Sequence, residues 1–493
     1  MRKVLSALLV LTIILSLVPA FAVSSQALQR GNWKYEVLGG KATITGLGSP
    51  VSGDIDIPSN FGGYPVTAIG RNVFFGCTEL TSINIPSSVT MIGEWAFGCT
   101  GLTSIDLPSS VTLIESAAFF GCTGLTSIDI PSGVITISDS TFSSCTGLTS
   151  ITIPEGVTTI GEYAFSGCTS LTSITIPEGV ATIKRGAFFG CTGLKSINIP
   201  ASVTEICEFS FSDCTGLTSI TSNSDNPVYK SAGNCLIEKA TKQLVFGCKT
   251  STIPSDGSVT SIGTRAFSGC SSLTKINIPE GIEAIGPFVF CACLELTNIN
   301  IPSTVKEICS NAFYGCTGLT NITVDKYNPI YISAGNCIVD ESTKTLVLGC
   351  KTSVIPSDGS VTSIAPFAFG GQSELMKITI SECITSIEDT SFAGCDNLTI
   401  YGKAGSYAQK YANENGIPFV ASDIPDFVYG DADGSGEVDI TDAMLVFYHV
   451  AKKELLPEEA LVRCNVNDDN DVDIADAMAI FYFVAKKTDS VRQ

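Results

Sequence analysis

Histidine and basic side chains are scarce in this chain of 493 residues. His449 is the sole histidine, which excludes any metal site or catalytic mechanism that needs two imidazoles. Lys and Arg number 28 against 48 Asp and Glu, so the formal net charge is −20. Because phosphate binding needs a basic surface, this charge balance argues against nucleic acid as the main partner.

Long apolar runs are also missing beyond the N-terminus. There, Arg2 and Lys3 precede an apolar run from Val4 to Val18, and Ala20-Phe21-Ala22 follows it. This order is typical of a signal peptide over residues 1–22, and the run is shorter than the about 20 residues that span a bilayer as an anchor. We therefore expect cleavage after Ala22 and a secreted, extracellular protein without a membrane span.

A repeat fills most of the remaining sequence. The segment CTGLTSIDIPSGVITISDSTFSS (Cys122 to Ser144) is followed directly by two close copies of equal length. The repeat therefore has a period of 23 residues. Ile128 and Ile130 alternate with polar residues, as in a strand with one buried face, and Pro131 ends that strand because it has no N–H to donate. One such coil cannot bury its own apolar side, so the copies must stack. The repeat predicts a mainly β solenoid.

The pattern L-x-x-I-x-I-P-x-x-V-x-x-I-x-x-x-A-F-x-G-C resembles the BspA-like leucine-rich repeat family. WKYEVLGGKATITG (Trp33 to Gly46) is similar to the N-terminal cap of that family, and IYGKAGSYAQKYANENGIPFV (Ile400 to Val420) to its closing helix and strand. The resemblance covers residues 30–421. It implies a right-handed solenoid on a secreted or surface-displayed bacterial protein, often used for adhesion or protein contacts.

The ligand of the solenoid is unknown from the sequence. The strand face is expected to carry small polar side chains, which form either a binding surface or a solvated sheet face: Ser104, Asp106, Ser127, Asp129, Ser150, Thr152, Ser173 and Thr175. Two insertions, residues 226–262 and 328–364, break the period in the same way. Each holds two short apolar runs around a polar turn, which predicts a β-hairpin. It is either a structural variant of the repeat or a protruding binding element.

Twenty cysteines would suggest disulfides in an exported protein. A residue that recurs once per coil forms a buried column, however, where cysteine acts as a small hydrophobe. We therefore expect free thiols in that column and regard Cys235/Cys248 and Cys337/Cys350 as the better disulfide candidates. Eleven cysteines share the position before the marker leucine: Cys77, Cys99, Cys122, Cys145, Cys168, Cys191, Cys214, Cys270, Cys293, Cys316 and Cys395.

The C-terminal part of the chain is acidic and carries a duplicated loop. D-A-D-G-S-G-E-V-D-I-T-D begins at Asp431, and N-V-N-D-D-N-D-V-D-I-A-D begins at Asn465. Oxygen-bearing side chains at positions 1, 3, 5, 7, 9 and 12 match a calcium loop of the EF-hand type. The predicted ligands of two calcium ions are Asp431, Asp433, Ser435, Glu437, Asp439 and Asp442, and Asn465, Asn467, Asp469, Asp471, Asp473 and Asp476.

Two loop–helix units with aspartate at position 12 resemble a type I dockerin, over residues 426–490. The resemblance implies a small all-α, calcium-binding module of two F-hand units whose partner is the cohesin of a scaffoldin in a cellulosome. Asn465 and Asn470 depart from the family's aspartate and glycine, and the lost charge weakens the second site. The implied cohesin-binding residues are Ile440, Thr441, Phe447, Tyr448 and Lys452, and Ile474, Ala475, Phe481, Tyr482 and Lys486. The phenylalanines could instead pack between the helices, and His449 is expected to be a surface residue.

Three classes of function remain. The first is a non-catalytic, monomeric cellulosome component, linked only indirectly to polysaccharide degradation. The second is a cellulosomal glycoside hydrolase, which needs two carboxylates in a cleft, but the repeats leave no room for a catalytic domain. The third is a cell-surface adhesin. No G-x-S-x-G, H-E-x-x-H or P-loop motif is present, and we expect no enzymatic activity.

Overall fold

The computed structural model describes residues 28–421, 432–433, 438–452, 456, 460–461, 464, 466 and 472–490. The described chain divides into two compact units. The first runs to Met376 and includes Ser386–Asn397, and the second holds Lys377–Thr385 and the described residues from Leu398 onward. The predicted signal peptide, residues 1–22, lies outside the described residues.

The first unit opens with a small sheet. β1 (Leu28–Arg30), β2 (Trp33–Leu38) and β3 (Lys41–Leu47) pair antiparallel, and β3 then pairs parallel with β6 (Tyr64–Ile69). The hairpin between β2 and β3 turns at Gly39 and Gly40, whose φ angles of 57° and 75° favour glycine. β5 (Asn60–Phe61) flanks β6, and the Phe61 ring stacks on Tyr35 at 4.3 Å. The segment from Trp33 to Gly46 is thus a hairpin that starts the stack.

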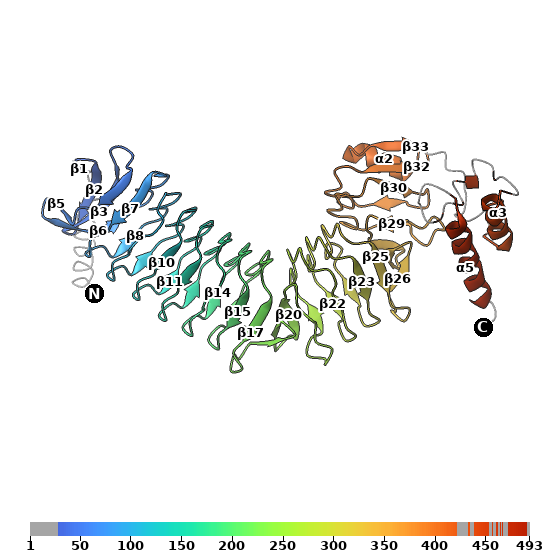
Figure 1. Ribbon diagram of the computed structural model, residues 1–493, viewed down its shortest axis with the longest axis horizontal. Coiled ribbons are helices and arrows are strands. Elements are labelled where there is room, and N and C mark those ends of the chain that lie inside the picture. The colour runs from blue at the N-terminus through green and yellow to red at the C-terminus, as the bar shows by residue number, and fades with distance from the viewer. Residues whose placement is uncertain are drawn as a thin grey trace, which may run out of the picture. The chain divides into compact units, whose positions relative to one another are not determined.

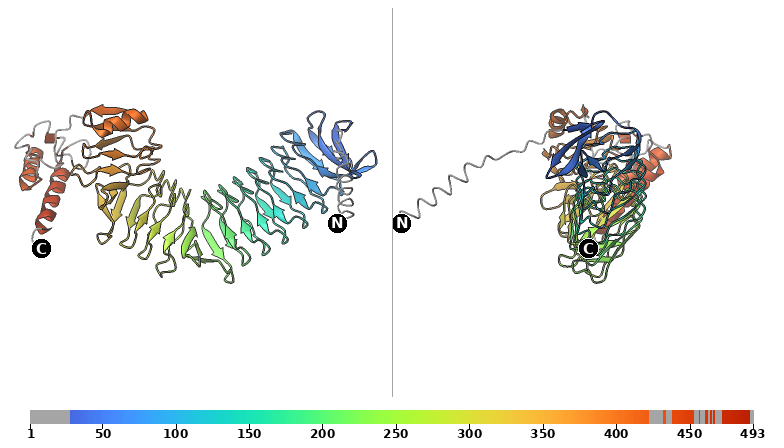
Figure 2. Two further views of the ribbon diagram at one scale, coloured as in Figure 1. Left: turned by 180° about the vertical axis from the view of Figure 1, so that it is seen from behind. Right: turned by 90° about the vertical axis from the view of Figure 1, so that its left-hand side faces the viewer.

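Stacked coils follow this sheet, as Figure 1 shows. Each coil has a front segment at the L-x-x-I-x-I pattern and a return strand at the following isoleucine. Both pair parallel in register with the next coil, for example Ile128 with Ile151 and Ile137 with Ile160. The predicted solenoid is confirmed for the first unit. Figure 2 shows the same coils from behind.

The strand bounds follow the repeat. The front strands of the first unit are β4 (Gly53–Asp56), β7 (Leu80–Asn84), β10 (Ser127–Asp129), β12 (Ser150–Thr152), β15 (Ser196–Ile199), β17 (Ser219–Ser222), β23 (Asn298–Ile301) and β25 (Asn321–Val324). Its return strands are β8 (Met91–Ile92), β9 (Leu113–Ile114), β11 (Thr136–Ile137), β13 (Thr159–Ile160), β14 (Thr182–Ile183), β16 (Glu205–Ile206), β21 (Ser261–Ile262), β22 (Ala284–Ile285), β24 (Glu307–Ile308), β29 (Ser363–Ile364) and β31 (Ser386–Ile387).

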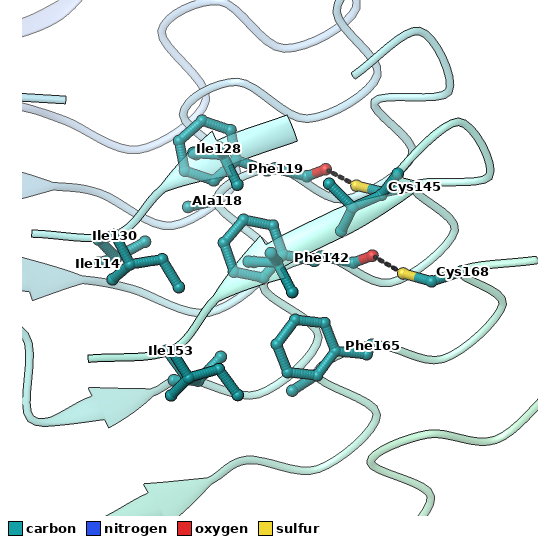
Figure 3. Packing of buried hydrophobic residues seen from close by; sticks show 14 of the residues in the cluster. Ile114, Ala118, Phe119, Ile128, Ile130, Phe142, Cys145, Ile153, Phe165 and Cys168 are labelled. Atoms are coloured by element: carbon teal, nitrogen blue, oxygen red, sulfur yellow. Dashed lines mark hydrogen bonds between the residues drawn. The ribbon is translucent and has the colours of Figure 1, made fainter. Parts of the chain in front are cut away.

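A column of phenylalanines fills the core of the coils (Figure 3). Phe119, Phe142 and Phe165 are fully buried, and their rings stack at 5.6 and 5.5 Å between centroids with planes within 11°. Offset stacking of this kind adds about 0.5–1.5 kcal/mol per pair beyond the burial of the rings. Because the rings stack from one coil to the next, contacts between neighbouring coils stabilise the unit.

A column of cysteines lies beside the rings. Cys145 Sγ donates to the carbonyl oxygen of Phe119 at 3.1 Å, and Cys168 Sγ to that of Phe142 at 3.2 Å (Figure 3). The same bond recurs in further coils at Cys122, Cys191, Cys214, Cys293, Cys316 and Cys395. The thiol therefore fills the space of a small hydrophobe and also satisfies a buried carbonyl. The free-thiol prediction for the column is confirmed.

Two expectations about the cysteines are wrong. Cys235, Cys248, Cys337 and Cys350 are free, so the candidate pairs form no disulfides. Cys99 lies outside the column because its coil is one residue shorter between phenylalanine and leucine. The buried Thr100 takes the column position instead and lies 3.3 Å from Cys122 Sγ.

Each insertion forms a three-stranded antiparallel element. The first is β18 (Tyr229–Ala232), β19 (Cys235–Glu238) and β20 (Gln243–Phe246), and the second is β26 (Tyr331–Ala334), β27 (Cys337–Asp340) and β28 (Thr345–Leu348). The two apolar runs form the predicted hairpin, and its second strand continues the stack by parallel pairing of β20 with β21 and β28 with β29. Most of the hairpin side chains are buried, so each insertion is a variant of the repeat and not a protruding element.

The second unit contains a closing sheet and a pair of helices. β30 (Lys377–Ile380), β32 (Thr399–Gly402) and β33 (Phe419–Ala421) pair parallel, and α2 (Tyr407–Asn415) packs on β32 and β33. Gly416 ends α2 in the left-handed conformation with φ 67°. Further along, α3 (Ile440–Val450) packs against α5 (Ile474–Ser490). The core between them includes Ala443, Val446, Ala477 and Ile480.

We predict that the thiol column resists alkylation in the folded protein. Iodoacetamide at about pH 8.5 should label the half-exposed Cys99 and Cys207 long before Cys145, Cys168 or Cys191, and guanidinium should make all three reactive. Peptide mapping by mass spectrometry measures this order. Labelling of Cys168 as fast as Cys99 would contradict the packing.

The same column predicts a loss of stability at alkaline pH. Burial raises the pKa of Cys191 to about 12, whereas an unfolded thiol ionises near about 8.5. Above that value the unfolded state loses protons that the folded state keeps, so the free energy of unfolding should fall as the pH rises from about 9 to 12. Urea titrations across this range check the sign, and Cys191→Ala should reduce the slope.

Candidate functional site

The first C-terminal loop closes on Asp442. This side chain is fully buried, and its Oδ1 accepts from the amides of Ala432 at 2.7 Å and Asp433 at 3.1 Å. Its Oδ2 accepts from the amide of Asp439 at 2.7 Å. Asp439 in turn caps α3 by accepting from Thr441 N at 2.6 Å. A reciprocal capping box therefore fixes the end of the loop to the start of the helix.

The second loop has the same construction. Asp476 is fully buried, its Oδ1 accepts from Val466 N at 2.7 Å, and its Oδ2 accepts from Asp473 N at 3.0 Å. Asp476, Val466 and Asp473 correspond to Asp442, Ala432 and Asp439 of the first loop. The two loop–helix repeats are thus alike in hydrogen bonding as well as in sequence.

The described part of each loop fits a hard cation. Burial raises the pKa of Asp442 even though three backbone amides donate to it, so a nearby positive charge would favour its ionised form. An all-oxygen donor set at this spacing suits calcium. Among the described residues alone, no group of three acidic, cysteine or histidine side chains is close enough to hold a metal. Asp433, Asp439, Asp442, Asp473 and Asp476 are described, whereas Asp431, Ser435, Glu437, Asn465, Asn467, Asp469 and Asp471 lie outside the described residues.

The predicted cohesin-binding residues fall on the two helices and their entrances. Ile440 and Ile474 stand at equivalent positions and are 49% and 51% exposed, and Thr441, Tyr448 and Lys452 are exposed as well. The side chains of Ala475, Tyr482 and Lys486 lie outside the described residues. The exposed, described members leave an apolar and hydroxyl-bearing surface available to a partner.

The two phenylalanines of this set differ. Phe447 is half-buried and packs on the core between the helices, whereas Phe481 is 41% exposed. Phe447 therefore serves packing, and Phe481 is the more exposed of the two. His449 is not merely a surface residue as predicted, because its Nδ1 accepts from Leu456 N at 3.1 Å and ties α3 to the chain that follows it.

The front face of the solenoid is polar and self-bonded. The eight side chains predicted there, from Ser104 to Thr175, are all exposed on one face. Neighbouring threonines of the front segments bond along the stack, as when Thr126 Oγ1 donates to Thr103 O at 3.2 Å and Thr149 Oγ1 to Thr126 O at 3.1 Å. This face therefore has the character of a solvated sheet.

A second surface, which the sequence analysis missed, lies at the outer turns that lead into the phenylalanine column. The residue two places before each column phenylalanine is left-handed in most coils, with φ between 53° and 63°. Large side chains occupy this costly conformation at Trp95, Tyr163, Phe209, Arg265, Phe288 and Phe367. We call these residues, with Phe75, Phe120 and Tyr314 beside them, the turn ridge.

The rings and cations of the turn ridge contact one another in two groups. Trp95 contacts Phe75 at 5.6 Å and Phe120 at 4.7 Å between ring centroids. Further along, the Arg265 guanidinium lies 4.2 Å from the Phe209 centroid and 4.3 Å from that of Phe288. A large aromatic side chain or arginine at one repeat phase, two residues before the marker phenylalanine, was the signal available in the sequence. Exposed aromatic and arginine side chains are the residues enriched at protein interfaces.

Neither described unit holds a helix that is both long and apolar enough to cross a bilayer. In comparisons with known proteins, no curated protein matches the chain. A leucine-rich cell surface protein from Faecalibacterium prausnitzii is 30% identical, with a TM-score of 0.56 over 79% of this chain and 97% of that one. The pneumococcal vaccine antigen PcpA is 19% identical, with a TM-score of 0.45 over 81% and 99%. A leucine-rich repeat protein from Bacteroides ovatus is 22% identical, with a TM-score of 0.40 over 80% and 99%.

The family model described as a BspA type leucine rich repeat region matches residues 54–169, 135–256, 238–357 and 344–403. These overlapping matches cover more than half of the chain and include both insertions. Solenoids of this kind are typically binding proteins without catalysis. The chain belongs to the BspA-type leucine-rich repeat family.

Proposed function

We propose that this chain is a secreted, non-catalytic binding protein in which recognition and attachment belong to different parts. The solenoid binds another protein or a surface ligand, and residues 426–490 act as a calcium-dependent type I dockerin for a cohesin. The observation that carries the proposal is the repeated closure of the two C-terminal loops on Asp442 and Asp476. Two unrelated acidic turns would not share three equivalent hydrogen-bonding positions.

Calcium, when bound, neutralises the carboxylates that crowd each loop. The residues of the chain then have defined tasks. Asp433, Asp439 and Asp442 offer oxygens in the first loop, and Asp473 and Asp476 offer oxygens in the second. The position-12 aspartates also hold the loop amides against the helix start, so that ligand placement and helix orientation are fixed together. Helix orientation in turn sets the surface that contains Ile440, Tyr448 and Phe481.

The turn ridge is the favoured recognition surface of the solenoid. Phe75 is 50% exposed beside Trp95, and rings with low side-chain entropy give large contact areas at interfaces. The polar front face has its hydrogen-bonding groups partly satisfied along the stack, so it offers less to a partner. An extracellular location agrees with the similarity to a cell surface protein of Faecalibacterium prausnitzii.

A cell-surface adhesin is the second candidate, favoured by that same relative and by the family match. The two candidates share the solenoid and differ only in what the C-terminal loops do. An adhesin needs no cohesin, whereas a cellulosome component must be retained by one.

We predict that calcium folds residues 426–490. Far-ultraviolet circular dichroism of this fragment should gain helix on addition of calcium and lose it on chelation, because apo carboxylates repel one another. Calorimetry should give a tighter first site, since Asn465 removes one charge from the second. Asp442→Asn should remove the tighter event and Asp476→Asn the weaker one, with the exposed Thr441→Ala as the control. A spectrum that does not change on chelation would contradict the proposal. Equal calcium affinities of the two loops would contradict the predicted order of the two sites.

We also predict that either of the two loop–helix repeats can dock on a cohesin. Tyr448→Ala with Lys452→Ala should leave much of the affinity for a matching cohesin, because the second unit presents nearly the same residues after a half-turn. Adding Tyr482→Ala and Lys486→Ala should abolish it. The exposed Met444→Ala is a control on the same helix. Thr441, opposite Ala475, can bias one orientation by about 1 kcal/mol, the net contribution of a single hydrogen bond. Complete loss in one half-variant would mean a single docking orientation.

A further inference from the structure

Three rings of the turn ridge lie together near the start of the solenoid. The Trp95 ring contacts Phe75 at 5.6 Å and Phe120 at 4.7 Å between centroids. Gly98 occupies the position of Phe75 and Phe120 in the coil between them, directly after the column phenylalanine. A β-carbon on Gly98 would lie 2.9 Å from Cδ2 of Phe75 and 3.0 Å from Cε3 of Trp95. The glycine therefore leaves the space that the Trp95 ring needs beside its neighbours.

Trp95 has a costly backbone conformation in a turn that does not require a large side chain. Its φ is 57°, and the same position holds Asn72 at 59° in the preceding coil and Ala117 at 56° in the next. Asparagine tolerates the left-handed region, whereas bulky residues are disfavoured there. Backbone strain of this kind collects at functional sites, and the inference runs from the outlier to the function. The strain therefore points to a role for the Trp95 ring beyond packing.

Phe75 and Trp95 line an open hollow of about 340 Å³, together with Arg71 and Asn72. Their ring planes are 81° apart, so the rings form two sides of the hollow and not one flat floor. The Phe75 side chain is 50% exposed, and Arg71 and Asn72 are exposed as well. The volume falls within the about 300–1,000 Å³ of small-molecule sites, so the hollow admits a ring-sized unit of a larger ligand.

The backbone beside the hollow is already paired from coil to coil. The amide of Asn72 donates to Glu94 O at 2.9 Å, and the amide of Trp95 donates to Ser116 O at 3.2 Å. A peptide that binds as an added strand needs free backbone groups on its partner, so that mode of recognition does not fit this surface. Recognition at the hollow therefore depends on side chains.

The polar side chains around the hollow favour a neutral ligand. Arg71 Nη1 lies 3.3 Å from Glu94 Oε2, and Glu115 Oε2 accepts from Glu94 N at 3.0 Å. One cation thus faces two carboxylates, so the surface offers an anionic ligand no net attraction. The guanidinium only donates hydrogen bonds, the carboxylates only accept them, and the Asn72 amide does both. Hydroxyl groups, which also donate and accept, match this set.

We propose that the hollow at Phe75 and Trp95 binds a neutral β-linked glucan. Every hydroxyl and linkage of such a chain is equatorial, so each sugar has an apolar C–H face for the rings and an edge of hydroxyls for Arg71, Asn72 and Glu94. The extended chain then continues toward Phe120 in the next coil but one. This assignment rests on the proposed role of the turn ridge as the recognition surface, and it names the ligand of that surface.

Tryptophan fluorescence of the full chain tests the site, because Trp33 and Trp95 are its only tryptophans. Trp33→Phe keeps a ring against Phe74 and leaves Trp95 as the sole reporter. Cellohexaose should shift the Trp95 emission saturably. Mannohexaose, which has an axial hydroxyl, and hexagalacturonate, which is anionic, should bind at least tenfold more weakly. Calorimetry of the unaltered chain gives the same affinities without a variant. No binding of cellohexaose, or equal affinity for all three, would overturn the proposal.

Trp95→Asn is the matched variant, because asparagine already holds the same left-handed position at Asn72 in the preceding coil. It should weaken cellohexaose at least tenfold without lowering the melting temperature. Gly98→Ala should also weaken binding, since the added carbon displaces both rings. Undiminished affinity in a folded Trp95→Asn chain would overturn the proposal.

Tyr327→Ala is the control, because Tyr327 is 74% exposed and lies outside the turn ridge, so its loss should leave the affinity for cellohexaose unchanged. Loss of binding in Phe288→Asn and not in Trp95→Asn would overturn the site but retain the turn ridge as the recognition surface. Calcium-induced helix formation and cohesin binding of the Trp95→Asn chain should be unaltered, so these two measurements test the proposed C-terminal function separately.

Discussion

The hydrogen bonds between outer turns are the constraint on which the rest of the first unit depends. They hold each coil one strand spacing from the next, and at that spacing the phenylalanine rings stack and the cysteine thiols reach the carbonyls of the preceding coil. In most coils the same turns hold the residue two places before the column phenylalanine in the left-handed region. Large side chains at that residue lie side by side along the turns, so the half-buried turn ridge follows from the backbone geometry that builds the core.

Interruptions of this ladder have local consequences. At each insertion a tyrosine hydroxyl replaces the missing neighbouring strand, as Tyr229 does for the amide of Ile206 at 3.1 Å and Tyr331 for that of Ile308 at 3.2 Å. The return strands are compensated in this way. In the outer turns one backbone bond per insertion remains, from Asp213 N to Ser268 O at 3.2 Å and from Gly315 N to Gly370 O at 2.9 Å. The outer turns at the two insertions differ at several positions, among them Ser212 against Tyr314, Phe209 against Asn311 and Arg265 against Phe367. A duplicated structural element thereby acquires two different surfaces.

The sequence predicted whatever depends on the period. Alternating isoleucines, the prolines after them and the recurrent phenylalanine specify strands, their ends and the core, and the free-thiol column follows from the phase of the cysteines. Effects that depend on one inserted or deleted residue could not be predicted. Cys99 leaves the column because its coil is one residue short, and Cys235 and Cys248 stay apart as free thiols although both are buried. In the C-terminal loops the spacing singled out Asp442 and Asp476 as calcium ligands, but it predicted neither their burial nor that Phe447 packs inward while its counterpart Phe481 is exposed.

The central structural claim is that the ladder of outer-turn amides is continuous through the coils before the first insertion and breaks at Phe209 and Phe211. Amide hydrogen exchange, resolved by residue, tests it most directly, because exchange reports whether an N–H is bonded in the folded protein. The amides of Phe165, Phe188 and Phe267, which donate to the next coil, should exchange slowly, and those of Phe209 and Phe211 should exchange orders of magnitude faster. Equal protection at all five positions would contradict the break.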